Sequence, residues 1–272
     1  MFRALVRATT DAARRAVAWK FEELQPPKEL SLFRFSSQDD LRKWIVHSDS
    51  DYGGLSSAGL ELGGDTNKTA VFSGTLSEEL REPGIGRIAR SGFSGMRTIQ
   101  GCSSFDLDSF DTLALRVKGD GRCYVSTIRT QSWWGTFEDA NTWQSMIFAP
   151  KDEWFEVMIP LSRYLPTMKG KIIELKSEMN QSRVCGMGLA VSVNGCLEGA
   201  VVGPGDFRLE LDWIKALPMD SVHGSYGMRE SSKTLLKHYH GNISLDEFLL
   251  RSRLSFITLS HNGCVCEVPC PT

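Results

Sequence analysis

The chain has 272 residues, of which 41% are hydrophobic and 24% charged, and its formal net charge is −2 at pH 7. A chain of this length can bury a large core, and its composition is that of an ordinary soluble globular protein. The near-neutral balance excludes a global attraction to nucleic acid or acidic lipid, and no stretch approaches the roughly 18 apolar residues that a membrane-spanning helix needs.

The first 20 residues form a basic segment. Its cations are Arg3, Arg7, Arg14, Arg15 and Lys20, against the single acid Asp11. On a helix at about 100° per residue, Arg3, Arg7 and Arg14 share one side and apolar residues the other. This pattern is typical of a mitochondrial targeting segment, although a helix packed on the domain surface would also show it. We expect residues 1–30 to be an amphipathic targeting or docking segment, whose helix ends at Pro26-Pro27.

Segments that alternate apolar and polar residues dominate the chain from residue 31 to residue 217. Strands are predicted over residues 31–35, 68–75, 113–118, 124–128, 143–148, 154–159, 187–193 and 207–213, with a further one ending near residue 96. Ser37 can cap a short helix in which Leu41, Trp44 and Ile45 share one face. Residues 163–178 are predicted to be irregular or partly helical. About ten strands separated by glycine-rich turns predict an all-β fold, an antiparallel jelly-roll β-sandwich over residues 31–217.

The central part of this pattern predicts a hairpin. Leu113, Leu115 and Val117 occupy alternate positions of one strand, and Tyr124 and Ile128 belong to the next. The Gly119-Asp120-Gly121 sequence between them can supply the positive φ angles of a short turn.

The end of the chain differs in character. Residues 218–272 are polar and rich in Ser and His, with one helix-like piece at 244–254, so we expect a poorly structured tail. The seven cysteines do not resemble a disulfide framework and indicate reduced thiols in a cytosolic or matrix compartment.

Metal and cofactor sites are not predicted. His238 and His240 could form a loose zinc cluster with Cys264, Cys266 and Cys270, but Cys264 and Cys266 are separated by a single residue, which is poor spacing for a zinc site. Asp106, Asp108 and Asp111 could bind Ca²⁺, but clustered turn carboxylates are more often solvated. No arrangement of nucleophile, acid and base points to catalysis.

An aromatic loop is the best candidate for a binding site. Trp133 and Trp134 are adjacent and cannot easily both face one core, and Arg129, Gln131 and Trp143 lie near them in the sequence. Exposed Trp together with Arg is typical of a contact hot spot. These five residues are therefore the predicted partner-binding surface, with two alternatives: a platform on which sugars stack, or tryptophans that cap the open end of the sandwich.

Four segments resemble a known family. They are Phe72-Ser73-Gly74, LALRVKGDGRCY at 113–124, WFEVMIPLSRY at 154–164 and GDFRLELDWIKAL at 205–217. Together they resemble the complex I intermediate-associated protein 30 family, in a form similar to its plant members, over about residues 31–217.

The resemblance implies a galactose-binding-like jelly roll and a mitochondrial role. Its members would act as chaperones, in the matrix or on the matrix face of the inner membrane, for membrane-arm intermediates of NADH:ubiquinone oxidoreductase. It implies complex I subunits and other assembly factors as partners, peripheral membrane association through them, and no nucleic acid, cofactor or catalytic residue. The alternative, suggested by the same fold, is a carbohydrate- or small-ligand-binding module.

Overall fold

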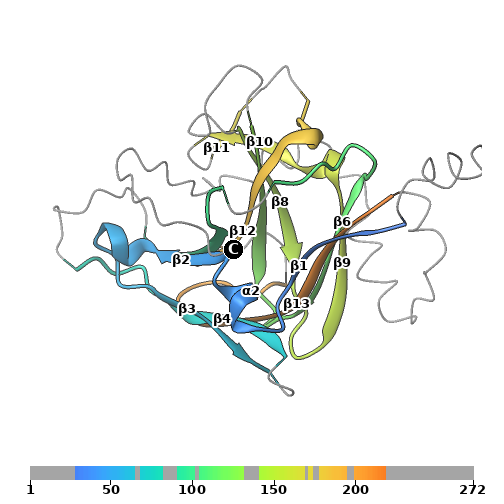
Figure 1. Ribbon diagram of the computed structural model, residues 1–272. Helices are drawn as coiled ribbons and strands as arrows, with labels where there is room; N and C mark the ends of the chain where they lie inside the picture. The colour runs from blue at the N-terminus through green and yellow to red at the C-terminus, as the bar shows by residue number, and fades with distance from the viewer. Residues whose placement is uncertain are drawn as a thin grey trace, which may run out of the picture.

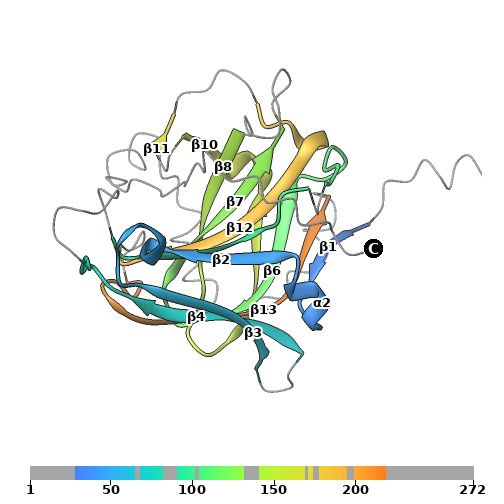
Figure 2. The ribbon, with the colours of Figure 1, turned by 60° about the vertical axis from the view of Figure 1, so that its left-hand side comes forward.

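The computed structural model describes residues 28–64, 68–81, 91–101, 104–131, 141–168, 171–173, 178–194 and 199–218. In these ranges the chain forms two antiparallel β-sheets that pack as two layers (Figures 1 and 2). The predicted antiparallel β-sandwich is therefore confirmed. The predicted amino-terminal helix and the tail beyond Pro218 lie outside the described residues. No helix in the described part is both long enough and apolar enough to cross a membrane.

The six-stranded sheet has the order β3-β4-β13-β6-β9, and β1 also pairs with β13. Its strands are β1 (Leu30–Arg34), β3 (Ser57–Gly63), β4 (Thr69–Leu76), β6 (Thr112–Lys118), β9 (Trp154–Pro160) and β13 (Gly205–Leu217). The 13-residue length of β13 lets it pair with three strands. On one side of β13, its first half pairs with β4 and its second half with β1. On the other side, its second half pairs with β6.

The seven-stranded sheet has the order β11-β10-β8-β7-β12-β5-β2. Its strands are β2 (Trp44–Ser48), β5 (Phe93–Thr98), β7 (Cys123–Thr130), β8 (Asn141–Phe148), β10 (Leu165–Met168), β11 (Lys171–Ile172) and β12 (Val184–Ser192). Short 3₁₀ turns lie at Asp49–Tyr52, Leu161–Arg163 and Gln181–Arg183. The region predicted to be irregular thus contains β10 and β11, which are four and two residues long, too short to show an alternation.

The predicted central hairpin does not form. β6 belongs to the six-stranded sheet and β7 to the seven-stranded sheet, so the Gly119–Gly121 turn crosses between the layers. The Asp120 carboxylate holds this crossing, accepting hydrogen bonds from the Arg122 N–H (3.0 Å), the Tyr124 hydroxyl (3.2 Å) and the Arg208 N–H of β13 (2.9 Å). The hairpin prediction was wrong because alternation shows which side of a strand is buried but not which strand pairs with it.

The alternating apolar residues of both sheets meet in one core. Leu113, Leu115 and Val117 of β6 are at most 2% exposed, and Met187, Leu189 and Val191 of β12 at most 3%. Each such side chain contributes about 1.5–3 kcal/mol when it is fully buried. The core therefore holds the two layers together across the sandwich.

A β-bulge changes the phase of β13. The register shifts between Leu211 and Trp213 opposite β6. Beyond this point Ile214 is buried at 2% exposure. Trp213, which strict alternation with Phe207, Leu209 and Leu211 would place on the buried side, is half-exposed on the outer face. A single extra residue in one strand produces such a change of face.

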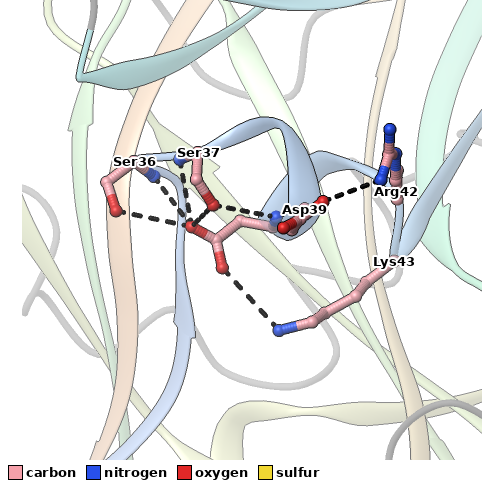
Figure 3. Close-up of polar contacts among 6 residues, drawn as sticks. Ser36, Ser37, Asp39, Arg42 and Lys43 are labelled. Carbon is pink, nitrogen blue, oxygen red and sulfur yellow. Dashed lines mark hydrogen bonds and ion pairs between the residues drawn. The ribbon is translucent and has the colours of Figure 1, made fainter. Parts of the chain in front are cut away.

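Ser37 begins the predicted short helix α2 (Gln38–Leu41). The Ser37 hydroxyl accepts a hydrogen bond from the Asp40 N–H (3.2 Å), and the Asp40 carboxylate accepts one from the Ser37 N–H (3.1 Å), a capping box that Figure 3 shows. The predicted common face of Leu41, Trp44 and Ile45 was wrong. The helix ends at Leu41, and strand β2 places Trp44 in the core while Ile45 is 38% exposed. Pairing with β5 overrides the helical pattern.

Candidate contact surface on the seven-stranded sheet

Two residues of the predicted contact site, Arg129 and Gln131, lie at the end of β7. Ser126, Ile128 and Thr130 point into the sandwich, so Thr127 and Arg129 point to the outer face of the sheet. Gln131 follows directly, half-buried. Its N–H donates to the Arg183 carbonyl (2.9 Å), and its carbonyl accepts from the Asn180 side chain (3.5 Å). Backbone pairing therefore positions Arg129 and Gln131 on one side of the sandwich.

Trp143 lies on the other side of the same strands. Its ring is 4% exposed, it is opposite Ile128 in the register of β8 with β7, and its Nε1–H donates to the Thr130 hydroxyl (2.9 Å). Trp143 thus supports β7 from the core and does not reach the outer face. Trp133 and Trp134 lie outside the described residues, and their exposure stays a prediction.

The structure adds Arg97 to this surface, a residue that the sequence analysis did not single out. Arg97 of β5 is opposite Gly188 of β12, and Arg129 of β7 is opposite Gly186. The two arginines therefore flank β12 on the same outer face, with glycines between them. The signal was present in the segment FSGMRT at 93–98, where Arg97 alternates with the buried Met96, but no sequence pattern showed that β12 separates β5 from β7.

The two arginines have no carboxylate partner among the described residues. Burial lowers the pKa of Arg97, and the charge of Arg129 lowers this pKa further, whereas the Tyr52 hydroxyl acts in the opposite direction. Burial also raises the pKa of Tyr52. The surface thus brings two cations and one phenol within electrostatic reach of each other.

The candidate metal ligands do not form a site in the described chain. Asp106 accepts a hydrogen bond from the Asp108 N–H (3.0 Å), and Asp111 accepts one from the Thr112 hydroxyl (2.8 Å). Within the described ranges no group of three His, Cys, Asp or Glu is placed to hold a metal ion. His238, His240, Cys264 and Cys266 lie outside those ranges. Cys123 and Cys185 are not in a disulfide.

Comparison with known proteins supports the resemblance seen in the sequence. A family model described as complex I intermediate-associated protein 30 matches residues 33–211. The mitochondrial complex I intermediate-associated protein 30 of Mus musculus is 30% identical over 210 residues, which are 75% of this chain and 60% of that protein. The protein of the same name from Drosophila melanogaster is 26% identical over 215 residues, 75% of this chain and 69% of that protein. The chain thus matches only part of the length of these relatives.

Solved structures with a similar fold include carbohydrate-binding modules. The family 11 module from Clostridium thermocellum, in complex with a β-1,3-1,4-mixed-linked tetrasaccharide, matches with a TM-score of 0.47 and 16% identity over 70% of this chain and 95% of the module. A family 30 module matches with a TM-score of 0.40 and 16% identity over 70% of this chain and 98% of the module. The carbohydrate belongs to those modules, and this likeness carries no ligand over to the present chain.

Proposed function

This chain belongs to the complex I intermediate-associated protein 30 family, and we propose that it is a non-enzymatic assembly factor for mitochondrial complex I. The observation that carries the proposal is the family match over residues 33–211, which includes nearly the whole described sandwich. Relatives in animals and in Neurospora crassa are named as mitochondrial proteins, and we assign this chain to the mitochondrion on that basis. In the proposed role, the sandwich holds immature membrane-arm intermediates and transforms no substrate.

The matrix, or the matrix face of the inner membrane, is the proposed location within the organelle. A basic segment at residues 1–30 would direct import, the domain at 31–217 would bind partners, and the polar tail at 218–272 would lie outside the sandwich. Cys123 and Cys185 are not in a disulfide, which is consistent with a reducing compartment.

The proposed partner contact is the outer end of β7 together with the segment that follows it. Arg129 and Gln131 are half-exposed on one face there, and Trp133 and Trp134 come next in the chain. An arginine with no carboxylate partner among the described residues can donate hydrogen bonds to a partner protein, and tryptophans can supply the apolar contact. Trp143 would support this surface from the core.

Deletion and complementation test the role. We expect loss of the gene to cause partial complex I to accumulate on blue-native gels of isolated mitochondria, and the tagged wild-type chain to co-migrate with those intermediates. Normal complex I in the deletion strain would overturn the assembly role.

The contact surface is tested in the same strain. A chain carrying Gln131→Ala, Trp133→Ala and Trp134→Ala should lose co-migration, whereas Arg34→Gln, an exposed change on the six-stranded sheet, should retain it. Loss in both variants, or in neither, would contradict the proposed surface while leaving the assembly role to the deletion result.

A further inference from the structure

We propose that Arg97 and Arg129 form a binding site for a phosphate group on the outer face of the seven-stranded sheet. The site would be a property of the sandwich itself, and it does not depend on the proposed assembly role. The strand register and two glycines place the arginines around an open stretch of β12. Neither arginine has a counter-charge among the described residues, and further polar groups lie on the same face.

The register places Arg97 and Arg129 on either side of β12. Arg97 and Arg129 lie on the two strands that flank β12, and their partners there, Gly188 and Gly186, are two residues apart. Neighbouring strands are about 4.8 Å apart, and two residues along a strand span about 6.7 Å. The Cα atoms of the two arginines are thus separated by two strand spacings across the sheet and by two residues along it. Two extended arginine side chains on the same face can cover that distance and meet above β12.

The glycines keep the surface between the arginines open. A Cβ added to Gly188 would lie 3.5 Å from the Arg97 Cβ, and one added to Gly186 would lie 3.9 Å from both the Cβ and the Cδ of Arg129. Any larger side chain at these two positions would therefore occupy the side of the strand on which the arginine stems lie. With glycine there, the floor between the arginines is bare backbone.

The charges are not neutralised within the described chain. Both arginines are half-buried, and the ion pairs of the described residues involve other cations. Arg129 lowers the pKa of Arg97, which is the effect of one cation on a nearby second cation. Two partly desolvated like charges destabilise the unliganded fold, and an anion bound between them would remove that cost.

Other polar groups on this face can complete the site. The Tyr52 hydroxyl lies within electrostatic reach of Arg97 and can donate a hydrogen bond. Gln144, opposite Thr127 in β8, is 6% exposed, and its Oε1 atom has no hydrogen-bond partner among the described residues. Its Nε2–H donates to the Thr127 hydroxyl (3.3 Å). Since that hydroxyl can donate or accept, the amide can turn and present its N–H groups to an anion.

Phosphate is the chemistry that matches two arginines. A phosphate monoester carries about −1.5 to −2 charges at pH 7, close to the charge of the pair, whereas a carboxylate carries one. The planar fork of each guanidinium can bind two phosphate oxygens at once. The group could come from a free phosphate compound or from a lipid headgroup, and two arms of one experiment distinguish these sources.

The first arm measures thermal unfolding of the full chain with inorganic phosphate, against KCl of the same ionic strength. A phosphate concentration about ten times the Kd of one site should raise the Tm by about 4 °C. Because phosphate also stabilises proteins without binding, the informative comparison is with variants. The double variant Arg97→Gln/Arg129→Gln should lose the added shift, Arg97→Lys/Arg129→Lys should retain part of it, and Arg34→Gln should retain all of it.

The second arm measures sedimentation of the chain with phosphatidylcholine vesicles that contain or lack phosphatidic acid. Co-sedimentation that needs phosphatidic acid and both arginines would assign the site to a lipid headgroup, and a shift with inorganic phosphate alone would assign it to free phosphate compounds. An equal phosphate shift in the wild type and both double variants, with no arginine-dependent co-sedimentation, would overturn the site. Complex I levels do not enter either readout, so this result and that of the assembly test are separable.

Discussion

On the six-stranded sheet, Arg116 and Lys215 meet acidic and aromatic partners from their own chain, whereas Arg97 and Arg129 on the seven-stranded sheet have no carboxylate partner among the described residues. Arg116 lies 3.1 Å from Asp212 and 5.4 Å from the centre of the Trp154 ring. Lys215 lies 2.9 Å from Glu29 and 4.8 Å from the centre of the Trp213 ring. The same residue types are therefore placed in two electrostatic settings.

This difference distinguishes cations that have a described counter-charge from two arginines that have none among the described residues. Ion pairs as exposed as Arg116–Asp212, whose side chains are 43% and 31% exposed, contribute at most about 1 kcal/mol, but they give each charge an opposite charge from the same chain. Arg97 and Arg129 have no counter-charge among the described residues, and their two charges repel each other. The proposed recognition surface is therefore the seven-stranded sheet, and four measurements test the difference between the two sheets.

The largest effect should come from the core beneath the seven-stranded sheet. Trp143→Ala should cost about 3–5 kcal/mol of unfolding free energy, because it removes a buried ring and leaves a cavity. Urea unfolding measures this, and Trp213→Ala is the matched control, since that ring is half-exposed on the other sheet and should cost less than about 1.5 kcal/mol. Equal costs for the two would contradict the assignment of Trp143 to the core.

A smaller effect should come from the most buried charge on the six-stranded sheet. The Glu210 side chain is 5% exposed, 3.1 Å from Arg208 and 3.8 Å from Lys118. Glu210→Gln should cost about 1–2 kcal/mol, because it removes a buried negative charge that pairs with Arg208 and with Lys118, whose side chain is 19% exposed. Asp212→Asn, at a more exposed pair, should cost less, and a reversed order would show that burial does not set the value of these pairs.

Which residues of a strand face the core could be predicted from the sequence. Met187, Leu189 and Val191 alternate with smaller residues and all lie in the core, and Ser37 marks the start of α2. These features depend on local periodicity and local hydrogen bonds, which a single segment contains.

The arrangement of the strands, and with it the site, could not be predicted in the same way. The sequence at Gly119–Gly121 is typical of a hairpin turn, but it connects the two sheets. Arg97 and Arg129 lie near each other only because β12, which is far along the chain, pairs with both β5 and β7. Such pairings depend on contacts between distant segments. The bulge at Leu211–Trp213 is likewise invisible in an alternating pattern.

Substitution of an arginine should have opposite effects on the unfolding free energy on the two sheets. Without phosphate, Arg97→Gln should leave the unfolding free energy unchanged or raise it by up to about 0.5 kcal/mol, because it removes a repulsion. Arg116→Gln should lower it by about 0.5–1 kcal/mol, because the change removes the ion pair and the ring contact. Denaturant unfolding at low salt measures both, and a larger loss for Arg97→Gln would contradict an unsatisfied pair.

The smallest effect concerns the thiol beside the arginine site. Burial raises the pKa of Cys185, and the charge of Arg129 lowers it in part. The Cys185 Sγ lies 3.4 Å from the Arg129 carbonyl, to which it donates a hydrogen bond. Arg129→Gln should raise this pKa further and slow iodoacetamide labelling of Cys185 at pH 8 about two- to threefold, because the thiolate is the reactive form. Peptide-resolved mass spectrometry measures the rate, with Arg34→Gln as the control variant. An unchanged rate would place the Arg129 charge away from β12 and would weaken the convergence of the two arginines on which the phosphate site depends.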